Sequence, residues 1–463
     1  MGNRLLITFQ PNRRPCLKLF VSLQWIKKQI NRTIMAAKIQ IKNDSIYNFG
    51  GFYFCVDHFR KSGLAELIDN TLGIRGVLAT YSYSEIVESL MQIFMTGGSR
   101  IEDAKRLSAQ FSEKTQGYKL CSPDTILKML SDQAAMDTFV DTKEGRSYKF
   151  NINSRLDKLL IDGLIKTEQV DTNISHTFDY DNQFIATEKY DSKYSYKKAF
   201  GYFPGIAQVD GLPFYIEGRD GNANVKLEQA ETLRRAFEAA EARGIKFDKA
   251  RMDCGSYARD IVEVVSKHCE TFYIRAMMCE SLRERIHKLQ DDVWKETEIN
   301  YQKCWLASLE FDSFLPECGY RLVVQRTLCE NGQTDLLDGQ FVFRCILTND
   351  HSSSEKDIVE FYNLRASTER CFDCMNNDFG WSCLPCSEMK ANTVFMIITA
   401  FIHNFYRYFI GLIAGAAFGL KATSRVKRFV FSFVSVPYKW VRCGLKKVLR
   451  LYTDNDAYLQ LQV

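Results

Sequence analysis

Strand-like and helical runs alternate between residues 172 and 275, and this order constrains the fold more tightly than any other feature of the sequence. Asp210-Gly211 separates two of the strand-like runs, which is typical of a hairpin. The runs are, in order, strands at 172–178, 205–209 and 213–217, an amphipathic helix at 227–240, a strand at 247–252, a helix at 257–267 and a strand at 272–275. This order predicts a mixed α/β fold whose first three strands are antiparallel.

The segments around this α/β core have different sequence patterns. Residues 53–140 are helical in pattern, and the short helices near Gly97, Gly98 and Ser122 suit either a helix-turn-helix module or a bundle without DNA contacts. Strand-like runs and Gly-containing turns dominate 292–349. We therefore expect a basic extension at 1–34, a helical DNA-binding domain at 35–150, the core in two parts at 151–291 and 350–420, a β-rich insertion at 292–349 and a basic segment at 421–463.

Charge is distributed unevenly along the chain. The net charge of +5 comes from 61 Lys and Arg against 56 Asp and Glu. Residues 1–34 hold seven basic and no acidic side chains, and residues 421–450 hold nine basic and none acidic. Removing these 16 basic residues and the two aspartates after residue 450 leaves 45 basic and 54 acidic side chains. A basic segment on an acidic body predicts a polyanionic partner, with phosphate contacts along 421–450 and carboxylates kept for another purpose.

The first 34 residues suit a transit peptide or an amphipathic anchor, because they are basic, free of acid and partly apolar. We favour a start codon placed too early, with Met35 opening the protein, since acidic residues begin only after it. We expect no secretory signal, because no compact apolar run precedes a small-residue cleavage site. The 15 Cys among 463 residues are too dilute for a disulfide scaffold and indicate a reducing cytosol.

Residues 392–420 are the most apolar stretch and are long enough to cross a membrane. His403, Asn404 and Arg407 interrupt the stretch near its middle, where polar groups are costly in lipid. We therefore expect a helix or helix pair buried within the protein, and no membrane partner.

Acidic residues follow the core strands. Asp179 and Asp181 are two positions apart at the end of the first strand, so their side chains share a face. Asp253 follows the strand 247–252, and Glu369 lies in the helical run after the β-rich segment. If these acids converge at one sheet edge, they form a hard oxygen site suited to Mg²⁺. The alternative is that an aspartate at a strand end only caps the next helix.

The segment around Glu369 favours the metal site. Tyr362, Arg365 and Glu369 are spaced by three and four residues and therefore share one helical face. An arginine fork and a hydroxyl one turn from a metal-binding glutamate would lie beside the metal and could grip a phosphate.

The order Asp, Asp, β-rich segment and Tyr362-x-x-Arg365-x-x-x-Glu369 resembles the DDE transposases of bacterial insertion sequences. The resemblance covers about residues 40–455 and is closest to the group with an RNase H-like core, a β-strand insertion and a Tyr-Arg-Glu-Lys signature. Further similar stretches are Phe178-Asp-Tyr-Asp181, Gly201-Tyr-Phe-Pro204, Arg219-Asp-Gly-Asn222, Arg251-Met-Asp253 and Asn377-Asp-Phe-Gly380.

The resemblance implies a catalytic triad of Asp181 or Asp179, Asp253 and Glu369, which would hold Mg²⁺, with Mn²⁺ as the alternative ion. It favours Asp181, although Asn182-Gln183 replaces the small-residue or Thr pair that usually follows. Tyr362 and Arg365 would contact the DNA backbone. The implied partners are double-stranded transposon ends (terminal inverted repeats), target DNA and a second copy in a synaptic dimer, all in the bacterial cytoplasm.

One position departs from the signature: Asn376 stands where the family has Lys. The loss of this cation keeps two alternatives open. The chain could be a catalytically inactive DNA-binding descendant of a transposase, or an RNase H-fold nuclease that cuts without strand transfer.

Two further clusters are candidates for binding. Lysines alternate with tyrosines just after the first acids, which suits a DNA-lining segment or an ordinary solvated face; the lysines are Lys189, Lys193, Lys197 and Lys198. Two Cys-x-x-Cys pairs could form a zinc site; they are Cys371 with Cys374 and Cys383 with Cys386. Because the first pair lies inside the predicted Glu369 helix, we expect reduced thiols and no structural zinc.

Overall fold

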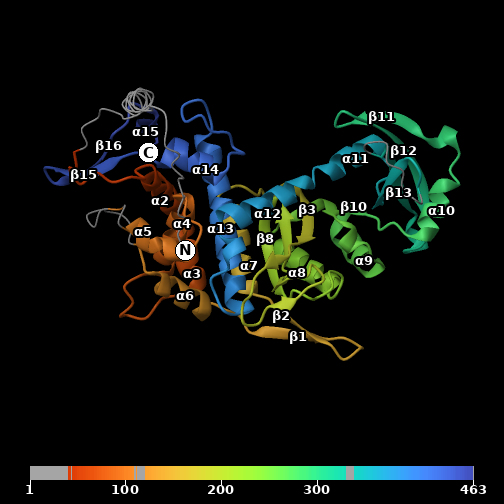
Figure 1. The fold of residues 1–463 in the computed structure, drawn as a ribbon, viewed down its shortest axis with the longest axis horizontal. Helices are drawn as coiled ribbons and strands as arrows, with labels where there is room; N and C mark the ends of the chain where they lie inside the picture. Colours follow the sequence, from red (N-terminus) through yellow and green to blue (C-terminus); the bar gives the residue numbers. More distant parts are fainter. Residues whose placement is uncertain (1–39, 43, 109–110, 112–119, 330–337, 462–463) are drawn as a thin grey trace, which may run out of the picture. The chain divides into compact units, whose positions relative to one another are not determined.

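The computed structural model describes residues 40–42, 44–108, 111, 120–329 and 338–461. The chain divides into a unit of residues 1–46 and a compact unit of residues 47–463, and every described helix and strand belongs to the second unit. The predictions for residues 1–34 lie outside the described residues. The main sheet of the second unit has the strand order β1-β2-β8-β7-β3-β9-β10-β14-β13-β12-β11 (Figure 1).

The middle of this sheet matches the order predicted from the sequence. Its strands are β3 (Ser175–Asn182), β7 (Gly205–Val209), β8 (Leu212–Arg219), β9 (Lys246–Met252) and β10 (Cys269–Arg275). The neighbours β3, β7 and β8 are antiparallel, whereas β3, β9 and β10 run parallel. The predicted mixed sheet with three antiparallel strands is therefore confirmed.

One helix connects β8 to β9 and a second connects β9 to β10. They are α8 (Gln229–Glu241) and α9 (Arg259–His268). The apolar residues Leu233, Phe237 and Ala240 of α8 are buried, as its amphipathic pattern predicts, and Phe237 stacks on Phe178 of β3 with ring centroids 4.1 Å apart. This contact fixes α8 on the sheet beside the strand that carries Asp179 and Asp181.

The β-rich segment extends the same sheet. Its strands are β11 (Lys295–Ile299), β12 (Gln302–Phe311), β13 (Tyr320–Leu328) and β14 (Phe341–Thr348), and α10 (Glu280–His287) precedes them. β14 pairs antiparallel with β10, which joins this segment to the core strands. Ile358, Val359 and Tyr362 of α11 (Glu355–Asn363) pack on it in one apolar cluster. The packing of α11 positions the start of α12 (Ala366–Asp378), which carries Glu369.

The other edge of the sheet differs from the prediction that residues 53–140 are helical throughout. The region 53–140 does contain helices, namely α2 (Phe52–Lys61), α3 (Leu64–Leu72), α4 (Tyr83–Met95), α5 (Ala104–Ser108) and α6 (Pro123–Asp132). The helical pattern ends at α6, however, and β1 (Asp137–Asp141) and β2 (Ser147–Asn151) form a hairpin that pairs with β8. Gly145 has a φ of +76° in the turn, a conformation that glycine adopts without strain.

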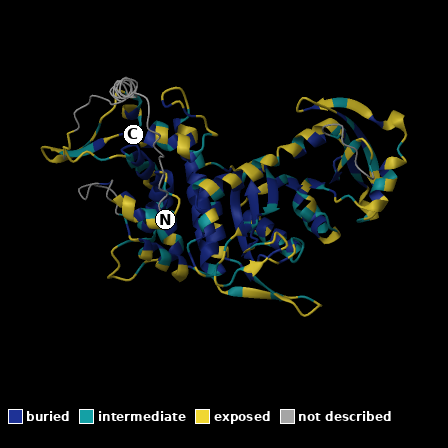
Figure 2. Cartoon of the chain, viewed as in Figure 1, coloured by how far each residue is buried: buried dark blue, intermediate teal, exposed yellow. Residues whose placement is uncertain are grey.

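The apolar stretch near residue 400 is one helix, α13 (Met389–Ile413), which packs against β8, α2, α4, α6 and α7 (Ser154–Lys166). Among the described residues it is the one helix long and apolar enough to cross a membrane, but 78% of that span is buried inside the protein (Figure 2). At Gly163 of α7 a Cβ would lie 2.5 Å from the ring of Phe401, so this glycine permits the close helix contact. The prediction of a buried helix is confirmed.

The C-terminal segment packs on the N-terminal helices. It contains α14 (Val426–Phe429), a π turn (Val430–Val434), β15 (Tyr438–Cys443), β16 (Lys446–Leu451) and α15 (Ala457–Gln460). Tyr47 bridges to Tyr438, and Phe54 contacts Phe433 and Tyr458. The N-terminal helices, α13 and the C-terminal segment thus share one apolar cluster.

Candidate active site

Asp181 and Asp253 lie at the ends of neighbouring parallel strands. The register pairs Tyr180 of β3 with Met252 of β9, so the next residue of each strand is an aspartate. Asp253 also caps the short helix that follows, because its Oδ1 accepts a hydrogen bond from the Gly255 N–H at 2.9 Å. Asp253 therefore both caps this helix and lies beside Asp181.

Burial and the neighbouring carboxylate of Asp253 both raise the pKa of Asp181. The pKa of Asp181 is raised to about 7, first by burial and then by the negative charge of Asp253, while Arg365 opposes the shift. Two carboxylates in a poorly solvated site repel one another, and a cation between them would relieve that repulsion.

The carboxylate of Asp179 is paired with Arg251. Arg251 donates from Nε and Nη2 to the two carboxylate oxygens of Asp179 at 2.8 and 2.7 Å. Asp179 is fully buried and Arg251 is 5% exposed, and Arg251 also donates to the Phe361 carbonyl at 3.1 Å. Burial raises the pKa of Asp179 although Arg251 opposes it. The two aspartates thus share a strand, and Asp179 is already paired inside the protein.

Arg365 connects Asp181 to Glu369. Its Nη1 donates to Asp181 Oδ2 at 2.9 Å and its Nη2 to Glu369 Oε1 at 3.2 Å. The Glu369 side chain is 67% exposed, whereas that of Asp181 is 17% exposed. Within the described ranges, no three His, Cys, Asp or Glu side chains form a group that could hold a metal ion. Two of the predicted acids therefore meet, and the third is held by Arg365.

Tyr362 is buried next to the end of β9. It is 6% exposed, and its hydroxyl donates to the Met252 carbonyl at 3.2 Å, one residue before Asp253. Burial raises its pKa to about 12. The predicted contact of Tyr362 with DNA stays a prediction, whereas Arg365 lies between the acids.

A cavity of about 420 Å³ opens beside the aspartates. Asp181, Asp253, Tyr196 and Lys197 are among its lining residues. A second cavity, of about 900 Å³, shares Tyr196 and Val225 with the first and runs along the β1–β2 hairpin. Of the four predicted lysines, Lys197 lines the first cavity, whereas Lys193 and Lys198 are exposed nearby and Lys189 is half-buried.

The comparison with protein families identifies the class. A family model described as Transposase DDE domain group 1 matches residues 34–413. The chain belongs to this family of DDE transposases. The match includes Asp179, Asp181, Asp253 and Glu369, and it implies an enzyme of transposition that binds DNA. A search of curated proteins found no match.

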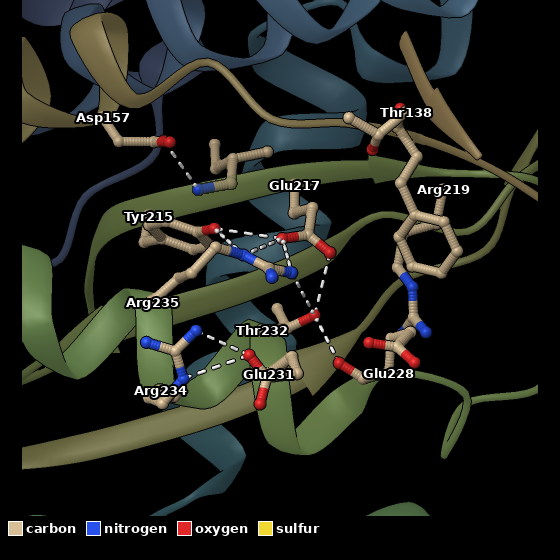
Figure 3. A network of polar contacts seen from close by, with 12 residues as sticks. Thr138, Asp157, Tyr215, Glu217, Arg219, Glu228, Glu231, Thr232, Arg234 and Arg235 are labelled. Atoms are coloured by element: carbon tan, nitrogen blue, oxygen red, sulfur yellow. Dashed lines mark hydrogen bonds and ion pairs between the residues drawn. The ribbon is translucent and has the colours of Figure 1, made fainter. Parts of the chain in front are cut away.

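The transposase also contains a buried polar network that the sequence pattern did not indicate (Figure 3). Glu217 of β8 is fully buried and accepts hydrogen bonds from Thr232 at 2.8 Å and from Tyr215 at 3.0 Å. Arg235 of α8 donates to the same carboxylate at 2.8 Å. This network attaches α8 to the antiparallel strands. Glu217 and Arg235 are 18 residues apart, so no local spacing reveals the pair.

A second such group holds the segment rich in lysine and tyrosine. Asp191 accepts hydrogen bonds from Lys149 at 2.5 Å, from the Tyr202 hydroxyl and from the Met389 N–H at 3.0 Å. These contacts attach the three-stranded sheet of β4 (Ile185–Ala186), β5 (Lys193–Tyr194) and β6 (Phe200–Tyr202) to β2 and to the start of α13. Asp191 thereby positions the segment that carries Tyr196 and Lys197.

The cysteines of the two predicted pairs are free thiols. Cys371 and Cys374 are buried in α12, and burial raises the pKa of Cys371 to about 12. Burial also raises the pKa of Cys386, to about 11. A raised pKa disfavours the thiolate that zinc requires. The absence of structural zinc stays a prediction.

Proposed function

We propose that the protein is the transposase of a bacterial insertion sequence, which cuts the ends of its element and joins the freed 3′-OH to target DNA. Asp181, Asp253 and Glu369 would be its catalytic acids. The observation that carries this proposal is the meeting of Asp181 and Asp253 at the ends of β3 and β9, where the pKa of Asp181 is raised to about 7. The ion pair of Asp179 with Arg251 supports Asp181 as the first acid.

The donor set fits a hard divalent cation. Asp181 and Asp253 offer carboxylate oxygens in a cavity, and their mutual repulsion favours a bound cation. We propose Mg²⁺, with Mn²⁺ as the alternative, and Glu369 would complete the site after exchanging Arg365 for the metal. When bound, such ions activate an attacking oxygen and stabilise the leaving oxygen in phosphoryl transfer.

The other residues would bind and orient the DNA. Arg365, released from Glu369, can grip a phosphate with its planar fork, and Lys197 contributes a second positive charge at the cavity. Tyr362 would position Asp253 through its hydrogen bond to the Met252 carbonyl. Lys189, Lys193 and Lys198 would contact phosphates farther along the strand. Holding the reacting groups in line contributes more to this reaction than acid–base chemistry by side chains.

The strand order supports the finer structural assignment. We infer that β3, β7, β8, β9 and β10 form an RNase H-like core, that β11–β14 are an insertion before the last acid, and that the helices of 35–150 bind DNA. A synaptic dimer on two inverted repeats, acting in the bacterial cytoplasm, completes the proposal by analogy with the family.

The test is strand cleavage by Asp253→Asn on DNA that carries the ends of the element, with Mg²⁺ present. We expect cleavage to be lost and DNA binding to remain, because the amide keeps the shape of the carboxylate but not its charge. Asp260→Asn, an exposed aspartate of α9, is the matched control and should cleave normally. An active Asp253→Asn protein would contradict the catalytic assignment.

Asn376 motivates the second candidate, an inactive DNA-binding descendant. It is half-buried in α12, where the signature has a lysine, and its carbonyl accepts a hydrogen bond from Ser382 at 2.8 Å. Binding without nicking by the unaltered protein would favour this alternative. Cut ends without joined products would favour the third alternative, a nuclease that lacks strand transfer.

A further inference from the structure

The basic C-terminal segment separates into a paired and an unpaired part. Arg425 forms ion pairs with Asp373 and Asp378 of α12, so its charge is used within the protein. Four other cations lie on the β15–β16 hairpin and are exposed; they are Arg442, Lys446, Lys447 and Arg450. In the part of the chain that the structure describes, none of these four forms an ion pair with an acid.

Like charges face one another across this hairpin. Its register places Arg442 opposite Lys447. Like charges directly opposite on neighbouring strands destabilise a hairpin. The native structure therefore retains a local repulsion that a polyanion would neutralise.

The hairpin has an anchored base and a charged tip. Tyr438, Trp440, Leu449 and Leu451 pack on the apolar cluster at the base. Arg442 and Lys447 continue that face beyond the packed residues, while strand alternation places Lys446 and Arg450 on the opposite face. The tip is exposed (Figure 2) and presents positive charge on both of its faces.

We propose that the tip of the β15–β16 hairpin binds double-stranded DNA by entering a groove and contacting phosphates on both sides. The major groove, about 12 Å wide, admits a two-stranded ribbon. Cations on both faces match a groove, which has a phosphate backbone on each side. The inference rests on the proposed DNA substrate and adds a contact surface that lies outside the matched family region of 34–413.

A lipid surface fits the hairpin less well than DNA does. Its tip exposes few apolar side chains, namely Leu445 at 94% and Val448 at 41%. Binding in a membrane interface requires a broad apolar face in addition to cations. Cations on both faces of the hairpin instead match the two phosphate backbones of a DNA duplex.

The first measurement is the salt dependence of DNA affinity for Lys447→Gln/Arg450→Gln. Each phosphate contact contributes about 0.9 to the slope of log affinity against log salt, so we expect the slope to fall by about 1.8. Affinity at low salt should fall at least tenfold. The matched control is Lys303→Gln/Lys356→Gln, which removes two lysines from surface ion pairs at equal cost in net charge and should keep the slope.

The second measurement separates a binding defect from misfolding. Lys447→Glu places an acid opposite Arg442, so we expect the melting temperature to rise slightly while DNA affinity falls. An unchanged salt slope, a lower melting temperature that accompanies the loss, or a loss of affinity for anionic phospholipid vesicles without loss for DNA would each overturn the proposal. Its failure would leave the catalytic proposal intact, because Asp253→Asn is scored by cleavage and the hairpin variants by binding.

Discussion

Arg251 holds Asp179 through two hydrogen bonds of 2.8 and 2.7 Å inside the protein, although 72 residues separate them in the chain. The pair joins β3 to β9 two residues before Asp181 and Asp253. We therefore expect Asp179 to have a structural role and Asp181 a catalytic one, and substitution of each residue can separate these roles.

We expect Asp179→Asn to lower the free energy of unfolding by about 3 kcal/mol, because it leaves the Arg251 guanidinium buried beside a neutral amide. Asp181→Asn removes a charge that is unfavourable in the folded state, so at pH 7 it should be at least as stable as the unaltered protein and yet fail to cleave DNA. Chemical denaturation and strand cleavage, measured on both variants, check the pair of expectations. The reverse pattern, with an inactive but stable Asp179→Asn, would make Asp179 the first catalytic acid.

The raised pKa of Asp181 predicts a pH dependence of stability. A free aspartate titrates near pH 4, whereas Asp181 in the folded protein titrates at about 7. Between these values the folded state keeps a proton that the unfolded state releases, so the free energy of unfolding falls as the pH rises from about 4 to about 7.

Asp181→Asn removes this titration. Its melting temperature should fall less steeply between pH 5 and pH 8 than that of the unaltered protein, measured without metal. Parallel curves would show that Asp181 titrates normally.

The network at Glu217 predicts unequal roles for two adjacent arginines of α8. Arg235→Met leaves the buried Glu217 without its cation and should lower the free energy of unfolding by about 3 kcal/mol. Arg234→Met removes only exposed ion pairs to Glu231 and Glu238 and should change the melting temperature little. Equal losses in thermal denaturation would argue against a special role of the Glu217 network.

Tyr196 is the aromatic residue shared by the two cavities next to the aspartates, and its side chain is 68% exposed. Stacking of a base on an aromatic ring contributes about 1–3 kcal/mol, so Tyr196→Ala should weaken binding of DNA with an unpaired strand near the cut site about tenfold. Tyr190→Ala removes a more exposed tyrosine that does not line either cavity and serves as the comparison. Equal affinities for the two variants in fluorescence anisotropy would exclude stacking on Tyr196.

Local patterns predicted those parts of the fold that depend on neighbours in the chain. Alternation and turn residues indicated the order of β3, β7 and β8, and the helical face of α8 followed from its spacing. The same patterns failed after Asp132, where residues 137–141 form a strand because β2 supplies its partner and β2 in turn pairs with β8.

The site was predictable to a similar extent. Strand ends indicated Asp181 and Asp253, because the carboxyl ends of parallel strands meet at one edge of a sheet. The sequence left Asp179 and Asp181 undecided, since the ion pair that distinguishes them involves a distant arginine. The contact of Arg365 with Asp181 spans 184 residues and depends on how α11 packs on the β-rich segment. Such partners follow from tertiary packing and leave no periodic signal.

The central position of α13 has a consequence for synthesis on the ribosome. The helices α2, α4 and α6 end by Asp132, yet the helix against which they pack begins only at Met389. At a synthesis rate of roughly 5–20 residues per second, the apolar faces of these helices remain without α13 for a time on the order of tens of seconds. We therefore expect chaperones to bind the nascent chain during this interval, and we expect a message broken before the codon for Met389 to yield a product that aggregates instead of a smaller folded protein.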